Sequence, residues 1–273
     1  MSHELRARRY AVISGKGGVG KSVITANLAA AFAHAGQRTL VLDADLGLAN
    51  LDVILGVDPV GTIQDVLDGS LKIEEVLVRT PAGFDLLPAG SGTLGMSLLT
   101  PALAMDLRRL LDRLESRYDV TLFDVGAGIG EVVLFFARLA DEIVLIVTPD
   151  PTSLMDAYAI VKILALRYGC TDFHLVVNQA DPNRTEQSGM AVAGRLQQVI
   201  SKFLVVEGGV PVRLHLAGSL PADPAVSKAI SRQRLLAETD PQAPFAALIP
   251  RLAAALRAVP DAYAPRIPVH DGA

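Results

Sequence analysis

Apolar and polar positions alternate along the chain in blocks of two kinds. Short apolar runs are typical of strands buried on both faces of a sheet, and longer stretches with apolar residues at helical spacing are typical of amphipathic helices. The predicted strands cover residues 10–13, 38–43, 84–87, 120–124, 142–148, 173–178 and 212–217. The predicted helices cover about residues 23–35, 62–67, 73–78, 103–117, 152–168 and 185–203.

Strands that alternate with helices predict parallel pairing through right-handed crossovers. The fold class is therefore α/β, with a single doubly wound domain whose mostly parallel sheet is flanked by helices. No linker, repeat or low-complexity stretch interrupts the alternation. We expect a short N-terminal arm at residues 1–9, the main domain at 10–240, and a C-terminal helix and tail at 241–273.

Composition narrows the class of protein only a little. The 273 residues are 51% hydrophobic, and 25 basic against 29 acidic residues give a net charge of −4, which makes no global case for nucleic-acid or membrane electrostatics. The single cysteine, Cys170, excludes an intrachain disulfide and a Cys-x-x-Cys metal site. With neither an apolar signal core nor an uninterrupted 18-residue apolar run, a cytoplasmic protein is expected.

The glycine-rich stretch between the first predicted strand and the first predicted helix carries the strongest chemical signal. It has the spacing of a phosphate-binding P-loop, although an unliganded strand–helix turn is the alternative. Bare N–H groups and the start of the helix would bind phosphate oxygens. Lys21 would reach the β- and γ-phosphates, and the Ser22 hydroxyl would bind Mg²⁺. The candidate nucleotide-binding residues are Gly15, Lys16, Gly17, Gly18, Val19, Gly20, Lys21 and Ser22.

Three acidic residues stand where predicted strands end. Asp124 follows an apolar run and is predicted to hold Mg²⁺ through water, with a turn-initiating aspartate as the alternative. Asp43 and Asp45 lie two apart, so on an extended stretch both could face the nucleotide. One would lie near the water shell of the metal and the other would orient the attacking water, unless the loop is simply solvated. The predicted metal site is Ser22, Asp43 and Asp124.

The lysine directly after the first glycine narrows the P-loop further. Lys16 gives a sequence that resembles the deviant Walker A box of the MinD/ParA group of ATPases. Residues 43–56 resemble the switch I region of MinD-like ATPases and, more narrowly, of the flagellar number regulators of the FlhG/FleN type. Further segments similar to that type are residues 87–92, 124–128, 148–158, 176–180 and 220–223, so that the resemblance covers about residues 9–235.

The resemblance implies a role for individual residues. It makes Asp45 the residue that activates water, within a catalytic set that also includes Lys16 and Lys21. It places adenine at Asn178, Pro221 and Asp223. It places a dimer seam at Lys16, Asn50, Asp150, Thr152 and Asp156, with Asp156 where the family pairs an acid with the signature lysine.

Two departures from the family pattern bear on these roles. Position 125 is valine where the family has threonine or serine, so a switch II hydroxyl is absent. The arm before the first strand is also shorter than in some relatives, which bears on any partner contact made by the arm.

The function implied by the resemblance is a nucleotide switch that hydrolyses ATP to ADP and phosphate with Mg²⁺. ATP would drive a two-fold homodimer, hydrolysis would release it, and the two states would bind different partners. The implied partners are a flagellar GTPase, a component of the flagellar switch complex or a transcription activator, and the implied role is control of flagellar number and placement.

Two other functions remain to be compared with this switch. A ParA/MinD-type segregation or cell-division positioning ATPase, acting on DNA or membrane, would need a binding surface. Lys228, Arg232 and Arg234 could form a basic one, but such charges are more typical of a solvated helix face, so specific nucleic-acid binding is not expected. A redox carrier with a cluster shared across a two-fold axis is excluded, because it needs two thiolates per chain.

The C-terminal stretch has apolar residues at helical spacing, with Arg251 and Arg257 off the apolar face. One interpretation is a helix that lies on a membrane surface, which would place the protein peripherally at the inner face of the cell membrane. The other is docking on the body of the protein itself. Pro250 interrupts the pattern, and residues 264–268 do not continue it.

Overall fold

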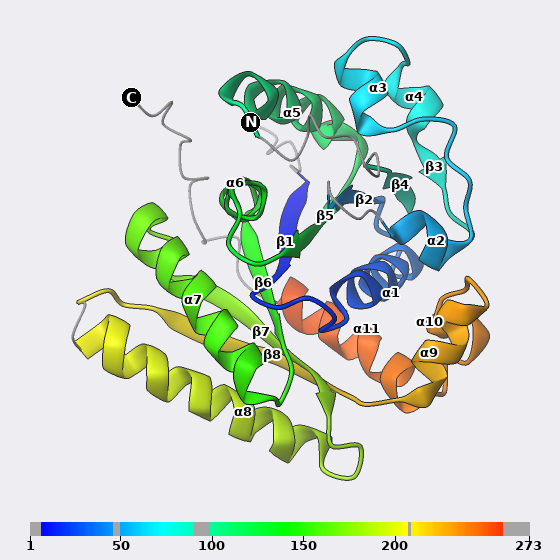
Figure 1. Ribbon diagram of the computed structural model, residues 1–273. Helices are drawn as coiled ribbons and strands as arrows, with labels where there is room; N and C mark the ends of the chain where they lie inside the picture. The colour runs from blue at the N-terminus through cyan, green and yellow to red at the C-terminus, as the bar shows by residue number, and fades with distance from the viewer. Residues whose placement is uncertain (1–6, 46–49, 90–98, 207–208, 259–273) are drawn as a thin grey trace, which may run out of the picture.

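The computed structural model describes residues 7–45, 50–89, 99–206 and 209–258. Within these ranges, eight strands form one sheet in the order β3-β4-β2-β5-β1-β6-β7-β8 (Figure 1), and every neighbouring pair is parallel except β3 with β4. The predicted doubly wound, mostly parallel sheet is therefore confirmed. The strands are β1 Arg8–Ser14, β2 Thr39–Ala44, β3 Val78–Arg79, β4 Asp85–Leu87, β5 Val120–Ala127, β6 Glu142–Val147, β7 Asp172–Ala180 and β8 Arg213–Pro221.

Most of the long helices begin at a proline, whose fixed φ suits the first turn and whose missing N–H costs nothing there. Thr100, Asp150 and Asp223 cap the helices that follow them through their side chains. The helices are α1 Lys21–His34, α2 Leu51–Leu55, α3 Ile63–Leu67, α4 Ile73–Val76, α5 Pro101–Leu114, α6 Glu131–Leu139, α7 Pro151–Tyr168, α8 Thr185–Ile200, α9 Pro224–Ser231, α10 Leu236–Thr239 and α11 Pro244–Arg257.

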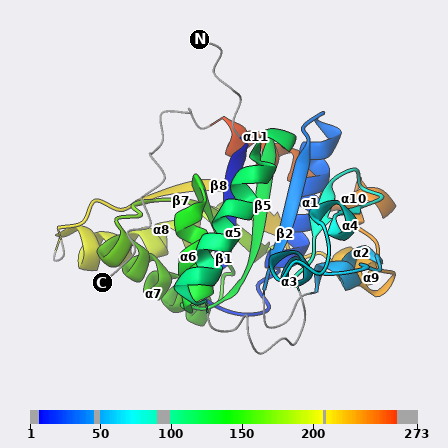
Figure 2. The same cartoon turned by 90° about the horizontal axis from the view of Figure 1, so that it is seen from above.

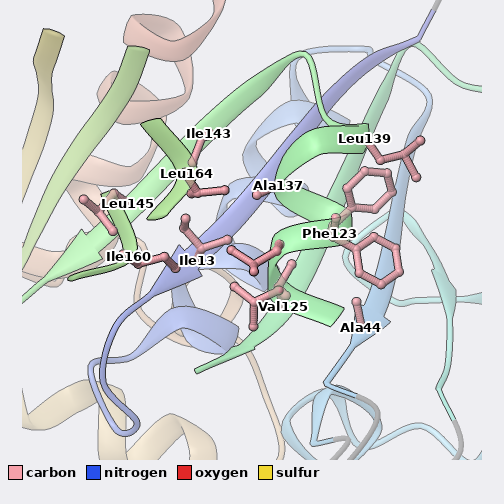
Figure 3. Packing of buried hydrophobic residues seen from close by; sticks show 14 of the residues in the cluster. Ile13, Ala44, Phe123, Val125, Ala137, Leu139, Ile143, Leu145, Ile160 and Leu164 are labelled. Carbon is pink, nitrogen blue, oxygen red and sulfur yellow. The ribbon is translucent and has the colours of Figure 1, made fainter. Parts of the chain in front are cut away.

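Two hydrophobic layers lie on opposite faces of the sheet, and two perpendicular views show the helices that cover them (Figure 1, Figure 2). Helices α5 to α8 cover one face, and α1 with α9 to α11 covers the other. Along β5 the side chains alternate between the layers: Phe123 and Val125 pack against α6 (Figure 3), whereas Leu122 faces α1. Val125 therefore faces the layer opposite α1, and its methyl groups fill a fully buried position.

Several elements differ from the predictions. Helix α6 was not predicted, because its apolar residues form one unbroken run from Val132 to Ala137, and so short a run cannot be assigned to a helix or a strand from its pattern alone. Helix α2 replaces part of a predicted loop. Strand β5 continues to Ala127, three residues beyond its predicted end, and β3 adds a two-residue antiparallel edge.

Helix α11 docks on the body of the protein. Its apolar face packs against α1 and β8 and buries Phe245, Ala246, Ile249, Leu252, Ala253 and Leu256. At its C-terminal end, the Tyr10 hydroxyl donates a hydrogen bond to the Leu256 carbonyl (3.3 Å), and Arg8 donates one to the Arg257 carbonyl (3.3 Å). The apolar face that one interpretation assigned to membrane binding is thus buried in the protein core, and Pro250 lies inside the helix. Val259 and the tail at 264–268 lie outside the described residues.

Across the described ranges, none of the helices combines the length and the apolar character that a membrane span requires.

Candidate nucleotide-binding site

The P-loop links the central strand β1 to helix α1. Its start is held by two hydrogen bonds, from the Ser14 hydroxyl to the Lys16 carbonyl (2.7 Å) and from the Gly128 N–H to the Ser14 carbonyl (2.9 Å). Gly15 packs directly on α7, where a methyl group would lie 2.3 Å from the carbonyl carbon and oxygen of Asp156. A side chain at position 15 would therefore push the loop away from α7.

The loop ends at the N-terminus of α1. Gly20 is the N-cap and has φ +92°, a backbone conformation that favours glycine. The N–H groups of the first helical turn have no intrahelical acceptor, so they and the helix dipole are available to an anion. Lys21 is the first residue of the helix and is 8% exposed, and its charge interacts with the carboxylate of Asp124.

Asp124 lies on β5 beneath the start of α1. Its carboxylate accepts a hydrogen bond from Ser22, lies 3.1 Å from the Thr25 hydroxyl, and interacts with the charge of Lys21. Burial raises its pKa to about 6, although the Ser22 hydrogen bond and the Lys21 charge favour the ionised form. The structure thus brings the predicted metal residues Ser22 and Asp124 into contact.

Asp43 stands at the end of β2 and organises the loop that follows. Its carboxylate accepts backbone hydrogen bonds from Asp45 (3.1 Å), Asn50 (3.2 Å) and Leu51 (3.2 Å), the last two at the start of α2. Burial, and then the charge of Asp124, raise its pKa to about 7 despite these three hydrogen bonds. The intervening residues 46–49 of the predicted switch I segment lie outside the described residues.

Asp45 lies against β5, close to the predicted metal ligand Asp124. A methyl group on Gly126 would be 3.3 Å from its Oδ1, and its charge contributes to raising the pKa of Asp124. Asp45 therefore lies at the same edge of the sheet as Asp124 and the P-loop, and its role in activating water stays a prediction.

Lys16 is held within its own chain by residues predicted for the dimer seam. Its Nζ lies 2.7 Å from the Thr152 hydroxyl and 3.3 Å from Asp150 Oδ1. Hydrogen bonds from Thr148 and Thr152 hold the pKa of Asp150 well below its usual range. The acid that pairs with Lys16 in this structure is thus Asp150, whereas Asp156 lies beside Gly15.

The residues predicted to surround adenine come from the ends of β7 and β8. Asn178 is buried, and its amide donates a hydrogen bond to the Val19 carbonyl in the P-loop (2.8 Å). Pro221 pairs with Ala180 in the β7–β8 ladder. Asp223 accepts hydrogen bonds from the N–H groups of Ala225 (2.9 Å) and Phe245 (3.2 Å). Its carboxylate therefore binds N–H groups in the first turns of both α9 and α11.

Thr25 is a site residue that the sequence did not indicate. It is fully buried, and its hydroxyl lies 3.0 Å from the Lys21 carbonyl as well as close to Asp124. The available signal was a hydroxyl residue between Ile24 and Ala26 on a helix of small and apolar residues. Such a buried hydroxyl needs a hydrogen-bond partner.

The donor atoms at this edge fit Mg²⁺. Ser22, Asp43 and Asp124 supply oxygen only, which suits a hard cation. Within the described ranges, no group of three or more His, Cys, Asp or Glu residues could hold a metal ion by itself. Mg²⁺ keeps several water ligands and is usually shared between one or two carboxylates and the phosphates of a nucleotide.

Fold and site together define a P-loop ATPase: a glycine loop after the central strand β1, a buried lysine, and acids at the ends of β5, which pairs with β1, and of β2, which pairs with β5. The family model described as CobQ/CobB/MinD/ParA nucleotide binding domain matches residues 10–236, and the chain belongs to this family.

Two relatives share much of the sequence. The antiactivator FleN of Pseudomonas aeruginosa is 40% identical over 232 residues, which cover 85% of this chain and 80% of FleN. The flagellum site-determining protein YlxH of Helicobacter pylori is 33% identical over 247 residues, which cover 90% of this chain and 80% of YlxH.

Solved structures show the same fold. The cell division ATPase MinD of Pyrococcus furiosus superposes with a TM-score of 0.74 at 25% identity, covering 92% of this chain and 98% of MinD. MinD of Pyrococcus horikoshii, complexed with Mg-ADP, gives a TM-score of 0.72 at 26% identity, covering 90% of this chain and 94% of MinD.

Proposed function

We propose that this chain is an ATP-hydrolysing dimerisation switch that regulates the number or placement of flagella by binding partner proteins in a nucleotide-dependent way. The observation that carries the proposal is the 40% identity with FleN across 85% of the chain. The similarity to YlxH, which is described as flagellum site-determining, points the same way.

ATP and Mg²⁺ are the cofactors. The P-loop and Lys21 bind the phosphates, Ser22 and Asp124 hold the metal ion, and Asp45 orients the attacking water. The contacts among Ser22, Lys21 and Asp124 support this assignment, as does the Mg-ADP complex of the Pyrococcus horikoshii relative. Asp43 contributes by holding Asp45 and the start of α2 in position.

Dimerisation makes use of the exposed edge around Lys16. In the ATP-bound dimer Lys16 leaves Asp150 and Thr152 and reaches the nucleotide of the second copy. Because ATP favours the dimer only through contacts that the monomer lacks, Lys16 supplies the differential binding energy. Asn50, Asp150, Thr152 and Asp156 form the rest of the seam.

The partners are a flagellar GTPase, a switch-complex component or a transcription activator. The name antiactivator, carried by FleN, favours the last of these. A MinC:MinD complex among the related structures, at 27% identity, shows that a member of the family binds a protein partner. The protein works in the cytoplasm, and a membrane role through α11 is disfavoured because its apolar face is buried on α1 and β8.

Deletion of the gene tests the proposal against a septum- or chromosome-positioning role. Flagella per cell are counted by electron microscopy, and septum and chromosome positions are scored in the same cells. We expect a changed number or position of flagella, restored by the wild-type gene and by a Lys162→Ala control but not by Lys21→Ala. Normal flagella with misplaced septa or chromosomes would contradict the proposal.

A further inference from the structure

Asn178 is joined to the phosphate loop. Its Nδ2 donates a hydrogen bond of 2.8 Å to the Val19 carbonyl, and the residue is only 6% exposed. Because the peptide unit is planar and trans, the carbonyl of Val19 and the N–H of Gly20 point in opposite directions. The hydrogen bond therefore fixes the direction of the Gly20 N–H, which points away from Asn178.

The contact between Asn178 and the loop is tight. A methyl group on Gly20 would lie 2.4 Å from the Asn178 Nδ2. Gly20 is also the N-cap of α1, so the amide of Asn178 packs on the residue where the loop becomes helix. Movement of Asn178 would be transmitted to the first turn of α1.

Strand β7 is distorted directly after Asn178. Gln179 has φ +56°, one of two non-glycine residues with positive φ in the described part of the chain. The register between β7 and β8 shifts between Val177 and Ala180. Backbone strain of this kind persists only where the surrounding structure requires it. Here it ends the regular strand at the residue whose amide reaches the P-loop.

The distorted segment also contacts the C-terminal end of β8. Ala180 pairs with Pro221, and its carbonyl accepts a hydrogen bond from the Ala222 N–H (2.9 Å). Residues 178–180 thus contact the P-loop on one side and the segment after β8 on the other.

We infer that Asn178 is a positioning residue for the phosphate loop, which acts through the Val19–Gly20 peptide and contributes to the binding of any polyphosphate whatever its base. The inference rests on the nucleotide-binding function of the P-loop and is independent of the flagellar role. A residue that only reads the base would contribute nothing to a ligand that has no base.

Calorimetry with Mg²⁺ and three ligands, inorganic tripolyphosphate, ATP and GTP, tests the inference on the full chain. Asn178→Ala should weaken all three by the same factor, about three- to tenfold, as expected for one lost hydrogen bond. The isosteric Asn178→Asp should weaken all three at least as much, because a carboxylate oxygen then faces the Val19 carbonyl. Circular dichroism melting of each variant establishes that it is folded. Asn178→Asp also keeps the side-chain volume, so it serves as the test where Asn178→Ala does not fold.

The distortion at Gln179 supplies matched controls. Gln179→Gly accepts positive φ freely and should leave all three affinities unchanged. Gln179→Val disfavours positive φ and should reproduce the loss, and the double variant with Asn178→Ala should lose no more than either single variant.

Two results would overturn the inference. One is unchanged binding of tripolyphosphate by Asn178→Ala together with unequal losses for ATP and GTP, which would make Asn178 a reader of the base. The other is wild-type protein that binds neither tripolyphosphate nor ATP, which would remove the phosphate site itself and so is distinguishable from the first.

Discussion

Asp43 and Asp124 stand directly opposite each other in the β2–β5 ladder, and both side chains are buried. Burial is the main cause that raises the pKa of each carboxyl, to about 7 for Asp43 and about 6 for Asp124. Two buried carboxylates beside one another are costly without a cation. The site is thus electrostatically arranged to receive one.

The stability of nucleotide-free protein should fall as the pH rises. The folded pKa of Asp43 is raised from 3.8 to about 7, so between these values the folded state binds a proton that the unfolded state has released. The contribution to stability is fully present below the unfolded pKa and is lost as pH rises through the folded pKa. Thermal melts in EDTA from pH 5 to pH 8 should show a decreasing Tm, with a shallower decrease in Asp43→Asn. The exposed Asp58→Asn should keep the wild-type slope, and equal slopes in all three proteins would contradict the assignment.

Lys21→Ala should weaken ATP binding by about one to two orders of magnitude, the effect of losing hydrogen bonds to a charged group. The change also leaves Asp124 without the cation that interacts with it in the folded protein. Calorimetry checks the loss, and Lys162→Ala, an exposed lysine on α7, is the matched control. Unchanged affinity in Lys21→Ala would mean that the phosphate site lies elsewhere.

Asp45→Ala should lose ATP hydrolysis but keep the dimer, whereas Lys16→Ala should lose the dimer but keep nucleotide binding. If Asp45 only orients water, Asp45→Ala leaves the P-loop intact, so the variant should bind ATP and stay dimeric while phosphate release falls. If Lys16 belongs to the site of the second copy, Lys16→Ala should bind nucleotide as a monomer. Size-exclusion chromatography with ATP and Mg²⁺, run beside a phosphate-release assay, separates the two. An Asp45→Ala monomer with ATP bound, or normal dimers of Lys16→Ala, would refute the switch.

Leu256→Ala should lower the free energy of unfolding by about 2–5 kcal/mol, the cost of a cavity in a packed core. Leu256 is fully buried at the end of α11, whereas Leu248 on the same helix is only half-buried. Leu248→Ala should therefore cost clearly less in urea denaturation. A helix reserved for a membrane would show no difference between the two, and liposome flotation would then show an ATP-dependent shift.

Local pattern was enough to predict the P-loop, the acids and most of the sheet. Lys21 and Ser22 lie within one short stretch, and Asp43 and Asp124 each end an apolar run. Their roles could therefore be inferred from neighbouring residues in the sequence, without knowing which distant residues they contact. Helix α6 escaped prediction because its sequence is mainly a short apolar run, which a buried strand could equally carry.

The pairings within the site could not be predicted in the same way. Asn178 binds a carbonyl 159 positions away, and Lys16 pairs with an acid 134 positions away. Only the strand order and the packing of α7 bring these groups together. For the same reason, Thr25 could not be assigned to Asp124 before the crossing of α1 over β5 was known.

The strand order also constrains how the chain is made. Strand β1 lies between β5 and β6, so after it leaves the ribosome it has no neighbour until residues 120–147 follow it. At ordinary translation speed the apolar segment Tyr10–Ile13 waits on the order of ten seconds for a partner. The face of α1 covered by α11 waits longer, until the last described helix is complete. A nascent chain of this design therefore depends on being shielded from other chains for most of its synthesis.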